Sequence, residues 1–149
     1  MTCISRSALL PYSAREMYDL VANVECYPQF LPWCSGAKIL SQDDEHAVAA
    51  IEISYHRLHK TFTTRNTLDP ARSMEMELVE GPFSHLHGVW RFDDLGDSNS
   101  QISFDIEFGF SNRVIGLALG PVFGKIADKL VENFRKRAVS IYGERVWEV

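Results

Sequence analysis

The stretch Ile102-Ser103-Phe104-Asp105-Ile106-Glu107-Phe108-Gly109-Phe110 places a large apolar side chain at every second position. A period of two is typical of a β-strand with one buried face and one solvent-exposed face. Three series with the same period lie upstream, at Ala49–Tyr55, Met74–Leu78 and Leu86–Phe92. Turn-forming Gly, Pro, Asp and Asn residues separate these series. The region from Ala37 to Phe110 therefore predicts six successive antiparallel strands joined by short turns.

The region before these strands predicts one more strand and a short helix. Ile4–Leu10 has the composition of a strand. Ser13 and Glu16 have the spacing of a capping box, and apolar residues recur at helical spacing from Met17 to Val24. Proline restricts its own backbone and that of the preceding residue, so we expect this helix to stop before Tyr27-Pro28.

A long amphipathic helix is predicted from Val122 to Gly143, where apolar residues repeat every three to four positions. Gly120-Pro121 suits its first turn, where the missing N–H of proline costs nothing. The preceding Val114–Leu119 is apolar and interrupted by glycine, which is compatible with an initial helical turn or a mobile lid. Together these elements predict a single α+β domain over residues 1–149, with a curved antiparallel sheet of about seven strands wrapped round the long C-terminal helix.

The composition limits the possible functions. With 149 residues and a formal net charge of −5, the chain is acidic, and its surface is not built broadly for nucleic acid. No apolar run approaches the ~20 residues of a membrane span, and the N-terminus lacks the pattern of a secretory signal. Cys3, Cys26 and Cys34 have no zinc-like spacing, so we expect reduced thiols in a cytoplasmic protein.

One local group of basic residues stands out in the predicted C-terminal helix. Its members are Lys125, Lys129, Arg135, Lys136 and Arg137. Such a run is most often the solvent-exposed face of a helix. The alternatives are contact with RNA or with a membrane surface.

The stretch from Val24 to Cys34 predicts a rigid apolar corner. Two prolines frame Tyr27, Phe30, Leu31 and Trp33, which are too apolar for an ordinary solvated loop. The corner is either the rim of a hydrophobic interior or a helix end whose aromatic side chains join the core. The inward face of the sheet carries more aromatic and methionine side chains than one helix covers. It therefore predicts either a small-molecule cavity or a close-packed core.

The chain lacks the motifs of catalytic and metal sites. There is no Gly-rich phosphate loop, zinc-type cluster or nucleophile elbow. His56 and His59 fall around a turn, whereas His85 and His87 lie in the solvent-exposed register of their strand. A metal site at His85 and His87 would need a third ligand, and the sequence reveals none nearby.

The inward register supplies few polar groups. They are Tyr55, Thr64 and Asn66, and no carboxylate or histidine joins them. General acid–base catalysis needs an ionisable side chain within reach of the substrate. We therefore expect a non-enzymatic binding protein that has no metal and requires no cofactor.

Three segments resemble the coenzyme-Q-binding branch of the START-like, helix-grip superfamily, which also contains Bet v 1-like proteins and polyketide cyclases. They are Tyr27-Pro28-Gln29-Phe30-Leu31-Pro32-Trp33-Cys34, Phe62-Thr63-Thr64-Arg65-Asn66 and the segment from Gly81-Pro82-Phe83 through Trp90 to Phe92. The resemblance covers nearly the whole chain in order and spacing, and it implies a helix-grip fold.

The resemblance implies two functions of different classes. One is binding of a polyprenyl quinone, such as ubiquinone, in an apolar cavity that supports respiration. The other is that of a toxin in a toxin–antitoxin pair, which binds the large (50S) ribosomal subunit and blocks 70S association. The apolar inward register and the acidic net charge favour the quinone. A third function, that of an aromatase or cyclase, is disfavoured because the interior lacks an acid or base.

The resemblance and the inward register together assign candidate residues to a quinone site. The mouth comprises Phe30, Leu31 and Trp33; the walls comprise Tyr55, Phe62, Met74, Met76, Trp90, Phe104 and Phe108; the helix side comprises Val122, Phe123, Ile126 and Leu130. Asn66 and Tyr55 are the candidate partners of the quinone oxygens. Val114–Leu119 is expected to open for the isoprenoid tail or to contact a membrane surface transiently, which implies a cytoplasmic protein peripheral to the inner membrane. Large ribosomal subunits and a small antitoxin protein are the partners in the second function.

Overall fold

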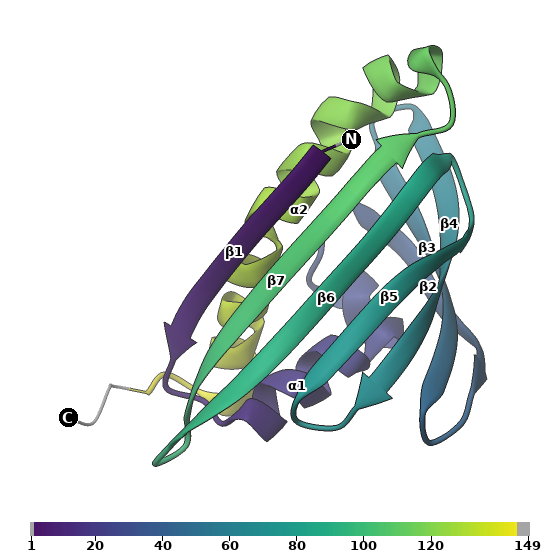
Figure 1. Ribbon diagram of the computed structural model, residues 1–149. Coiled ribbons are helices and arrows are strands. Elements are labelled where there is room, and N and C mark those ends of the chain that lie inside the picture. Colours follow the sequence, from purple (N-terminus) through teal and green to yellow (C-terminus); the bar gives the residue numbers. More distant parts are fainter. Residues whose placement is uncertain (1, 146–149) are drawn as a thin grey trace.

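The computed structural model describes residues 2–145, which form one curved antiparallel sheet closed by a long helix (Figure 1). The seven strands lie in the order β1-β7-β6-β5-β4-β3-β2. Their bounds are Thr2–Leu10 (β1), Cys34–Gln42 (β2), His46–Tyr55 (β3), Leu58–Asp69 (β4), Ser73–Glu80 (β5), Phe83–Gly96 (β6) and Asn99–Phe110 (β7). The helices are α1 (Ala14–Ala22), the 3₁₀ helix η1 (Val24–Gln29) and α2 (Arg113–Tyr142). The predicted α+β fold is confirmed.

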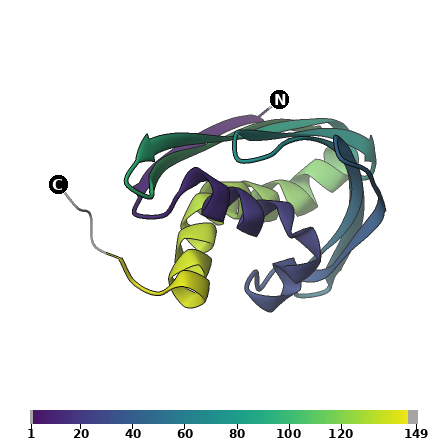
Figure 2. The ribbon, with the colours of Figure 1, turned by 90° about the horizontal axis from the view of Figure 1, so that it is seen from below.

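The alternating pattern decides which side chains face the helix. Trp90 of β6 pairs with Met74 of β5 and Phe104 of β7, and each of the three is only 1% exposed. Arg91 and Asp105, the next residues along, point to the opposite face, where they form an ion pair. Figure 2 shows the sheet curving over α2, with α1 and η1 beneath it beside that helix. The concave face of the sheet therefore carries the core.

The capping box predicted for the short helix is present. Ser13 Oγ accepts a hydrogen bond from Glu16 N, and Glu16 Oε1 accepts one from Ser13 N. The α-helix ends at Ala22, before Tyr27-Pro28 as expected. The following segment, predicted as a rigid apolar corner, forms the 3₁₀ helix η1, which runs through Pro28. The carbonyl of Tyr27 accepts hydrogen bonds from both Phe30 N and Leu31 N.

The prediction that the long helix begins at Gly120-Pro121 was wrong. The helix α2 begins at Arg113, because Asn112 caps it by accepting a hydrogen bond from Ile115 N, and Pro121 lies inside it. Of the two alternatives for Val114–Leu119, the structure thus confirms helical turns at the start of the helix and not a separate lid. Proline cannot donate to the carbonyl of Leu117, one turn earlier. The Leu117 side chain is 72% exposed, so this turn is open to water, which can hydrate the free carbonyl.

Candidate functional site

A cavity of about 60 Å³ lies between the concave face of the sheet and α2. Most of its lining is aliphatic, aromatic or thioether in character. The lining residues are Val24, Tyr27, Trp33, Ile51, Phe62, Thr64, Asn66, Met74, Met76, Leu86, Trp90, Phe104, Ile106, Phe123, Ile126, Ala127 and Leu130. An apolar enclosure with few polar groups suits a small apolar ligand or part of a larger one.

The polar groups at the cavity differ in whether they have partners. Thr64 and Asn66 are both 2% exposed, and Thr64 Oγ1 donates to Asn66 Oδ1 over 2.8 Å. The hydroxyl of Tyr27 donates to the carbonyl of Val21. Trp33 Nε1 is buried and has no acceptor among the described residues. The indole N–H of Trp33 is therefore a donor that a bound ligand would satisfy.

The cavity contains little that could act as an acid or base. Tyr27 is the one ionisable residue among the described lining residues, and burial raises its pKa well above the usual range for tyrosine. Nearby Cys34 is buried as well, and burial raises the pKa of its thiol to about 11, so it is protonated at neutral pH. Among the described residues that line the cavity, none is suited to proton transfer near neutral pH.

A second hollow adjoins the cavity on the outside of the protein. This groove has a volume of about 480 Å³ and lies between α2, the end of β3 and the segment before β2. Its lining residues are Pro32, Trp33, Ser54, Tyr55, His56, Val122, Lys125, Ile126, Lys129 and Asn133. Trp33 and Ile126 line both hollows, so these two side chains separate the groove from the cavity.

The structure brings most of the predicted site residues together at the cavity. Those that line it are Trp33, Phe62, Asn66, Met74, Met76, Trp90, Phe104, Phe123, Ile126 and Leu130. Leu31 and Phe108 are buried in the surrounding core and do not line it. Phe30 packs against Tyr27 and Phe134 and lines a separate depression, and Val122 lines the outer groove.

The placement of Tyr55 in the cavity wall was wrong. It is 46% exposed and lies in the outer groove. Its position in the alternating series is inward, like that of Ile53, but it is the last residue of β3, next to the turn at His56. An inward-facing side chain at this strand end reaches the groove instead of the cavity.

Seven lining residues were not assigned to the site from the sequence. They are Val24, Tyr27, Ile51, Thr64, Leu86, Ile106 and Ala127, of which Tyr27 had been placed only in the apolar corner and Thr64 only in the inward register. Ile51, Leu86 and Ile106 belong to the same alternating series as the residues that were chosen, so the pattern contained a signal for them. The choice favoured aromatic and methionine side chains and overlooked aliphatic ones.

The predicted basic group divides into paired and unpaired side chains. Arg135 forms a bidentate ion pair with Glu132, and this hydrogen bonding lowers the pKa of the Glu132 carboxyl. Arg137 donates to Gln29 and stacks on the ring of Phe30. By contrast, Lys125, Lys129 and Lys136 are exposed and form no ion pair with any carboxylate in residues 2–145. At spacings of four and seven residues, these three lysines form one row along α2, the lysine row.

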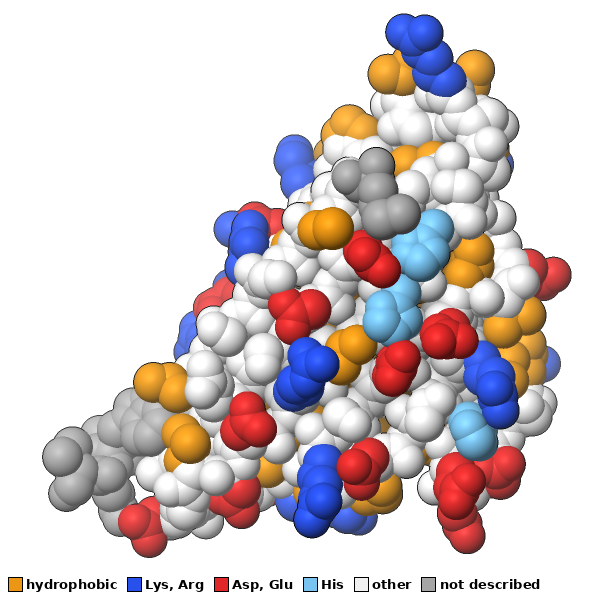
Figure 3. All heavy atoms as spheres, viewed as in Figure 1, with side chains coloured by type: hydrophobic (Ala, Val, Ile, Leu, Met, Phe, Trp, Pro, Cys, Tyr) orange, Lys and Arg blue, Asp and Glu red, His pale blue; other side chains and the backbone are white. Residues whose placement is uncertain are grey.

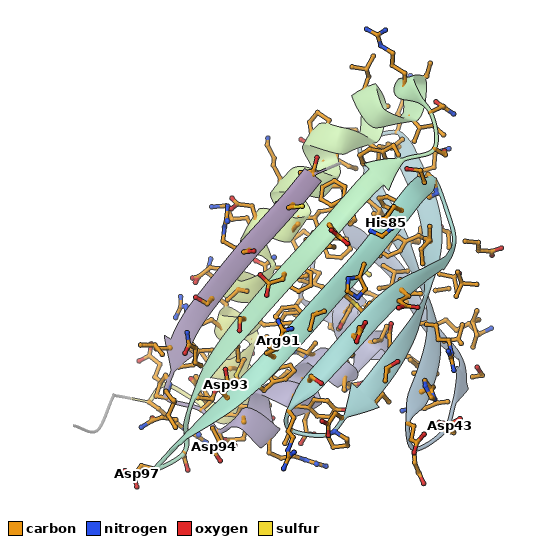
Figure 4. The ribbon with its side chains drawn as sticks, in the orientation of Figure 1. Asp43, His85, Arg91, Asp93, Asp94 and Asp97 are labelled. Atoms are coloured by element: carbon orange, nitrogen blue, oxygen red, sulfur yellow. The ribbon has the colours of Figure 1, made fainter. Side chains whose placement is uncertain are left out.

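The outer face of the sheet carries the paired histidines. His85 bonds to Glu107 over 3.0 Å and His87 to Glu75 over 2.8 Å, which confirms their solvent-exposed register. Figure 4 places His85 on β6, with Asp93, Asp94 and Asp97 at the opposite end of the β6–β7 hairpin. The expectation that no further ligand lies nearby was wrong, because Glu75 and Glu77 approach His87 to within 4.8 Å. Cross-strand pairing accounts for this contact, and we assign no metal site there.

The fold and the cavity define a class: helix-grip proteins, in which a curved sheet and a C-terminal helix enclose an apolar space. The chain belongs to the polyketide cyclase / dehydrase and lipid transport family, whose sequence profile matches residues 10–135.

Similar proteins include bacterial ones that match over nearly their whole length. The ribosome association toxin RatA of Pseudomonas aeruginosa is 44% identical over 95% of this chain and 99% of its own length. RatA of Escherichia coli K12 is 46% identical over 97% of this chain and 92% of its own. A mitochondrial coenzyme Q-binding protein homolog of Xenopus laevis is 28% identical over 95% of this chain and 59% of its own length.

Solved structures with the same fold support the assignment of the chain to the helix-grip class. An 18 kDa protein of Caulobacter crescentus is 30% identical, with a TM-score of 0.74 over 97% of this chain and 100% of that one. The Zhui aromatase/cyclase from a Streptomyces species has a TM-score of 0.76 at 20% identity, over 97% of this chain and 99% of that one. At that identity the likeness to the aromatase concerns the fold alone.

Proposed function

We propose that this protein associates with the ribosome and acts as a toxin of the ribosome-association kind. The observation that carries the proposal is the 44–46% identity to proteins named for that function, over 95–97% of this chain. The finer part of the proposal is that it binds the large ribosomal subunit and opposes the joining of the subunits. The residue-based ranking put quinone binding first, but the named relatives support ribosome association better.

The charge distribution offers a surface for ribosomal RNA. Phosphate contacts dominate the affinity of proteins for RNA, and they require exposed cations that are not already paired. The lysine row (Lys125, Lys129 and Lys136) meets this requirement within the described residues. On the outer face of the sheet, acidic and basic side chains are instead interspersed (Figure 3). We therefore place the ribosomal contact on the α2 side of the molecule.

Sedimentation with purified ribosomal subunits tests this proposal. We expect the protein to co-migrate with the large subunit, to reduce the yield of joined ribosomes, and to dissociate as salt is raised. Reversing the charges at Lys125, Lys129 and Lys136 to Glu should abolish co-migration. Reversal at Lys38, Arg65 and Arg91, on the sheet, changes the net charge equally and should not. Protein that never co-migrates with either subunit at low salt would refute ribosome association.

A second candidate function is binding of an apolar ligand, with an isoprenoid quinone as the candidate. The apolar cavity and the unpaired N–H of Trp33 favour it, as does the similarity to a protein named for coenzyme Q binding. A water molecule needs about 10–15 Å³ of such space, so 60 Å³ holds a few waters or a small group. A quinone ring would therefore require side chains to move, and the unbranched Met74 and Met76 are suited to do so.

Organic extraction followed by mass spectrometry tests the second function. Purified protein should release an isoprenoid quinone, or should take up added ubiquinone with quenching of tryptophan fluorescence. Protein that is empty and refuses ubiquinone would exclude this ligand. We infer binding without turnover, because the described lining offers no acid or base suited to neutral pH. An antitoxin partner and contact of Val114–Leu119 with a membrane stay predictions; no helix within residues 2–145 has the length and hydropathy to cross a bilayer.

A further inference from the structure

The outer groove has a charge that the cavity lacks. Lys125 and Lys129 of α2 stand along one side, and His56 stands at the turn after β3. No carboxylate is among the described residues that line it, although acidic residues outnumber basic ones in the chain by 20 to 15. Lys125 and Lys129 are the only fully charged side chains among the described residues that line the groove, so the groove is complementary to an anion.

Apolar side chains make up much of the groove lining. We refer to Trp33, Val122 and Ile126 as its floor. Tyr55, which is 46% exposed, also lines the groove, and Ser54 and Asn133 are its neutral polar members. Such a floor excludes a simple hydrated anion as the best-fitting occupant, because it offers contact area only to an apolar group. Cations at the rim and an apolar floor together match an amphiphile: a molecule with an anionic head and a hydrocarbon chain.

The groove adjoins the inner cavity. Trp33 and Ile126 are the shared wall between the two hollows. Trp33 is only partly buried as a residue, yet its Nε1 is buried without an acceptor. The indole packs against the core, but no hydrogen bond from Nε1 to a described residue fixes its orientation. Rotation of the indole would join the groove to the cavity and give a chain in the groove a path inward.

We propose that the groove is a binding site for a single-chain anionic amphiphile. Lys125 and Lys129 hold the phosphate or carboxylate head, the chain lies on Trp33, Val122 and Ile126, and its end enters the cavity past Trp33. An isoprenoid quinone is uncharged and makes no use of the two lysines. RNA would use the lysines but gains nothing from the apolar floor or from the cavity behind it. The inference rests on the second proposed function only in that the cavity accepts an apolar group.

Calorimetric titration with dodecyl phosphate, below its micelle concentration, tests the site. Dodecan-1-ol supplies the same chain without charge, and inorganic phosphate supplies the head without the chain. We expect dodecyl phosphate to bind at least tenfold more tightly than either. It should also shift the indole N–H resonance of Trp33, identified by its absence in Trp33→Phe.

Two matched variants locate the head group. Lys125→Gln/Lys129→Gln should reduce the preference for dodecyl phosphate over dodecan-1-ol to less than twofold. Lys38→Gln/Lys136→Gln removes the same amount of charge from the protein. Lys38 lies on the sheet and Lys136 on α2, and neither lines the groove, so this variant should keep the full preference for dodecyl phosphate over dodecan-1-ol.

Several results would overturn the inference. These are equal binding of dodecyl phosphate and dodecan-1-ol to the unaltered protein, an unchanged preference in Lys125→Gln/Lys129→Gln, or tight binding of inorganic phosphate alone. Lysine-dependent binding of an RNA oligonucleotide without binding of dodecyl phosphate would make the groove an RNA site instead. Neither ribosome sedimentation nor ubiquinone uptake enters this titration, so failure of a proposed function and failure of the inference are distinguishable.

Discussion

Met76 of β5 and Gly88 of β6 are cross-strand partners, and a Cβ atom on Gly88 would lie 2.8 Å from Cε of Met76. The other neighbours of such a Cβ, Phe104 and Ile106, would be at ordinary contact distance, 3.5 and 3.6 Å. Only the flexible end of Met76 would have to move. Because Met76 lines the cavity, Gly88 determines how much room the cavity retains.

We expect Gly88→Ala to reduce ligand uptake more than stability. The loss of chain entropy in the unfolded state stabilises by about 0.4–1 kcal/mol, and displacement of Met76 offsets it, so the net change should be within about 1 kcal/mol. Binding of an apolar ligand should weaken about tenfold, equivalent to ~1.4 kcal/mol. Urea denaturation and ligand titration measure the two effects.

The control for Gly88→Ala is Gly124→Ala, since a Cβ on Gly124 would meet nothing within 4 Å. Gly124 lies within α2, so its replacement should stabilise the protein by about 1 kcal/mol and leave binding unchanged. Adding Met76→Ala to Gly88→Ala should restore binding. Undiminished uptake by Gly88→Ala alone would show that Met76 does not limit the cavity.

Pro121→Ala should strengthen the first two turns of α2. Alanine restores the hydrogen bond to the carbonyl of Leu117 and has a helix propensity about 3 kcal/mol better than proline. We expect the free energy of unfolding to rise by about 1 kcal/mol or more, with slower amide exchange over residues 113–120. Gly120→Ala is the comparison, because its Cβ would lie 3.6 Å from the ring of Phe110 and fits without strain. Faster exchange in Pro121→Ala would contradict this account.

Glu16 and Arg145 join α1 to the residues after α2, over 2.7 and 2.8 Å. Hydrogen bonds from Arg145, followed by those from Ser13, hold the pKa of Glu16 below its ordinary value of 4.5 against the opposing effect of burial. Because the folded pKa is the lower one, the stabilisation is complete above the ordinary value and is lost as the pH falls through the lowered pKa. Arg145→Ala should therefore destabilise the protein near neutral pH and flatten the acid side of its stability profile.

Urea denaturation across the acid range checks the Glu16 prediction. A smaller difference should persist at low pH, because Arg145 also stacks on Tyr12 at 4.9 Å, and that contact does not require ionised Glu16. Lys38→Ala removes an equal charge from the exposed face of β2 and should leave the profile unchanged. A pH-independent loss of stability in Arg145→Ala would refute the assignment.

Trp33→Phe and Trp90→Phe should differ in cost. Trp33→Phe removes apolar contact but also the unpaired buried N–H, so the net loss should be within about 1 kcal/mol. Trp90 is 1% exposed and stacks on Phe104 at 4.4 Å, and its replacement should cost about 2 kcal/mol or more. Thermal unfolding measures both. Equal costs would mean that the Trp33 N–H has a partner in solution.

The fold was predictable because its pattern is local. A period of two assigns inward and outward faces without knowledge of the partner strands, and the capping box at Ser13 marks a helix start within four residues. The start of α2 was not predictable in the same way. Gly116, Gly120 and Pro121 are poor helix formers. They are nevertheless helical because Asn112 caps the helix and because the ring of Phe110 packs against Gly116 and Gly120.

The candidate site was less predictable, because it depends on where the sheet extends beyond the helix. Tyr55 has the correct alternation, yet it lies at a strand end where only the outer groove adjoins it. The net charge weighed towards quinone binding in the ranking of functions, although it averages over the whole surface and does not reveal a local basic row. A contact with RNA requires only one row of unpaired lysines. Which basic side chains are unpaired depends on their neighbours in three dimensions, because Glu132 pairs with Arg135 and Phe30 stacks against Arg137.

The helix α2 follows all seven strands in the chain, and this order has a consequence during synthesis. The nascent polypeptide contains all seven strands, with their apolar and aromatic inward faces, before α2, which covers those faces, has been translated. Intermediates with uncovered apolar surface are prone to aggregate. Successful production in the cell therefore depends on chaperones shielding the half-made protein, or on the translation of α2 outpacing the association of neighbouring chains.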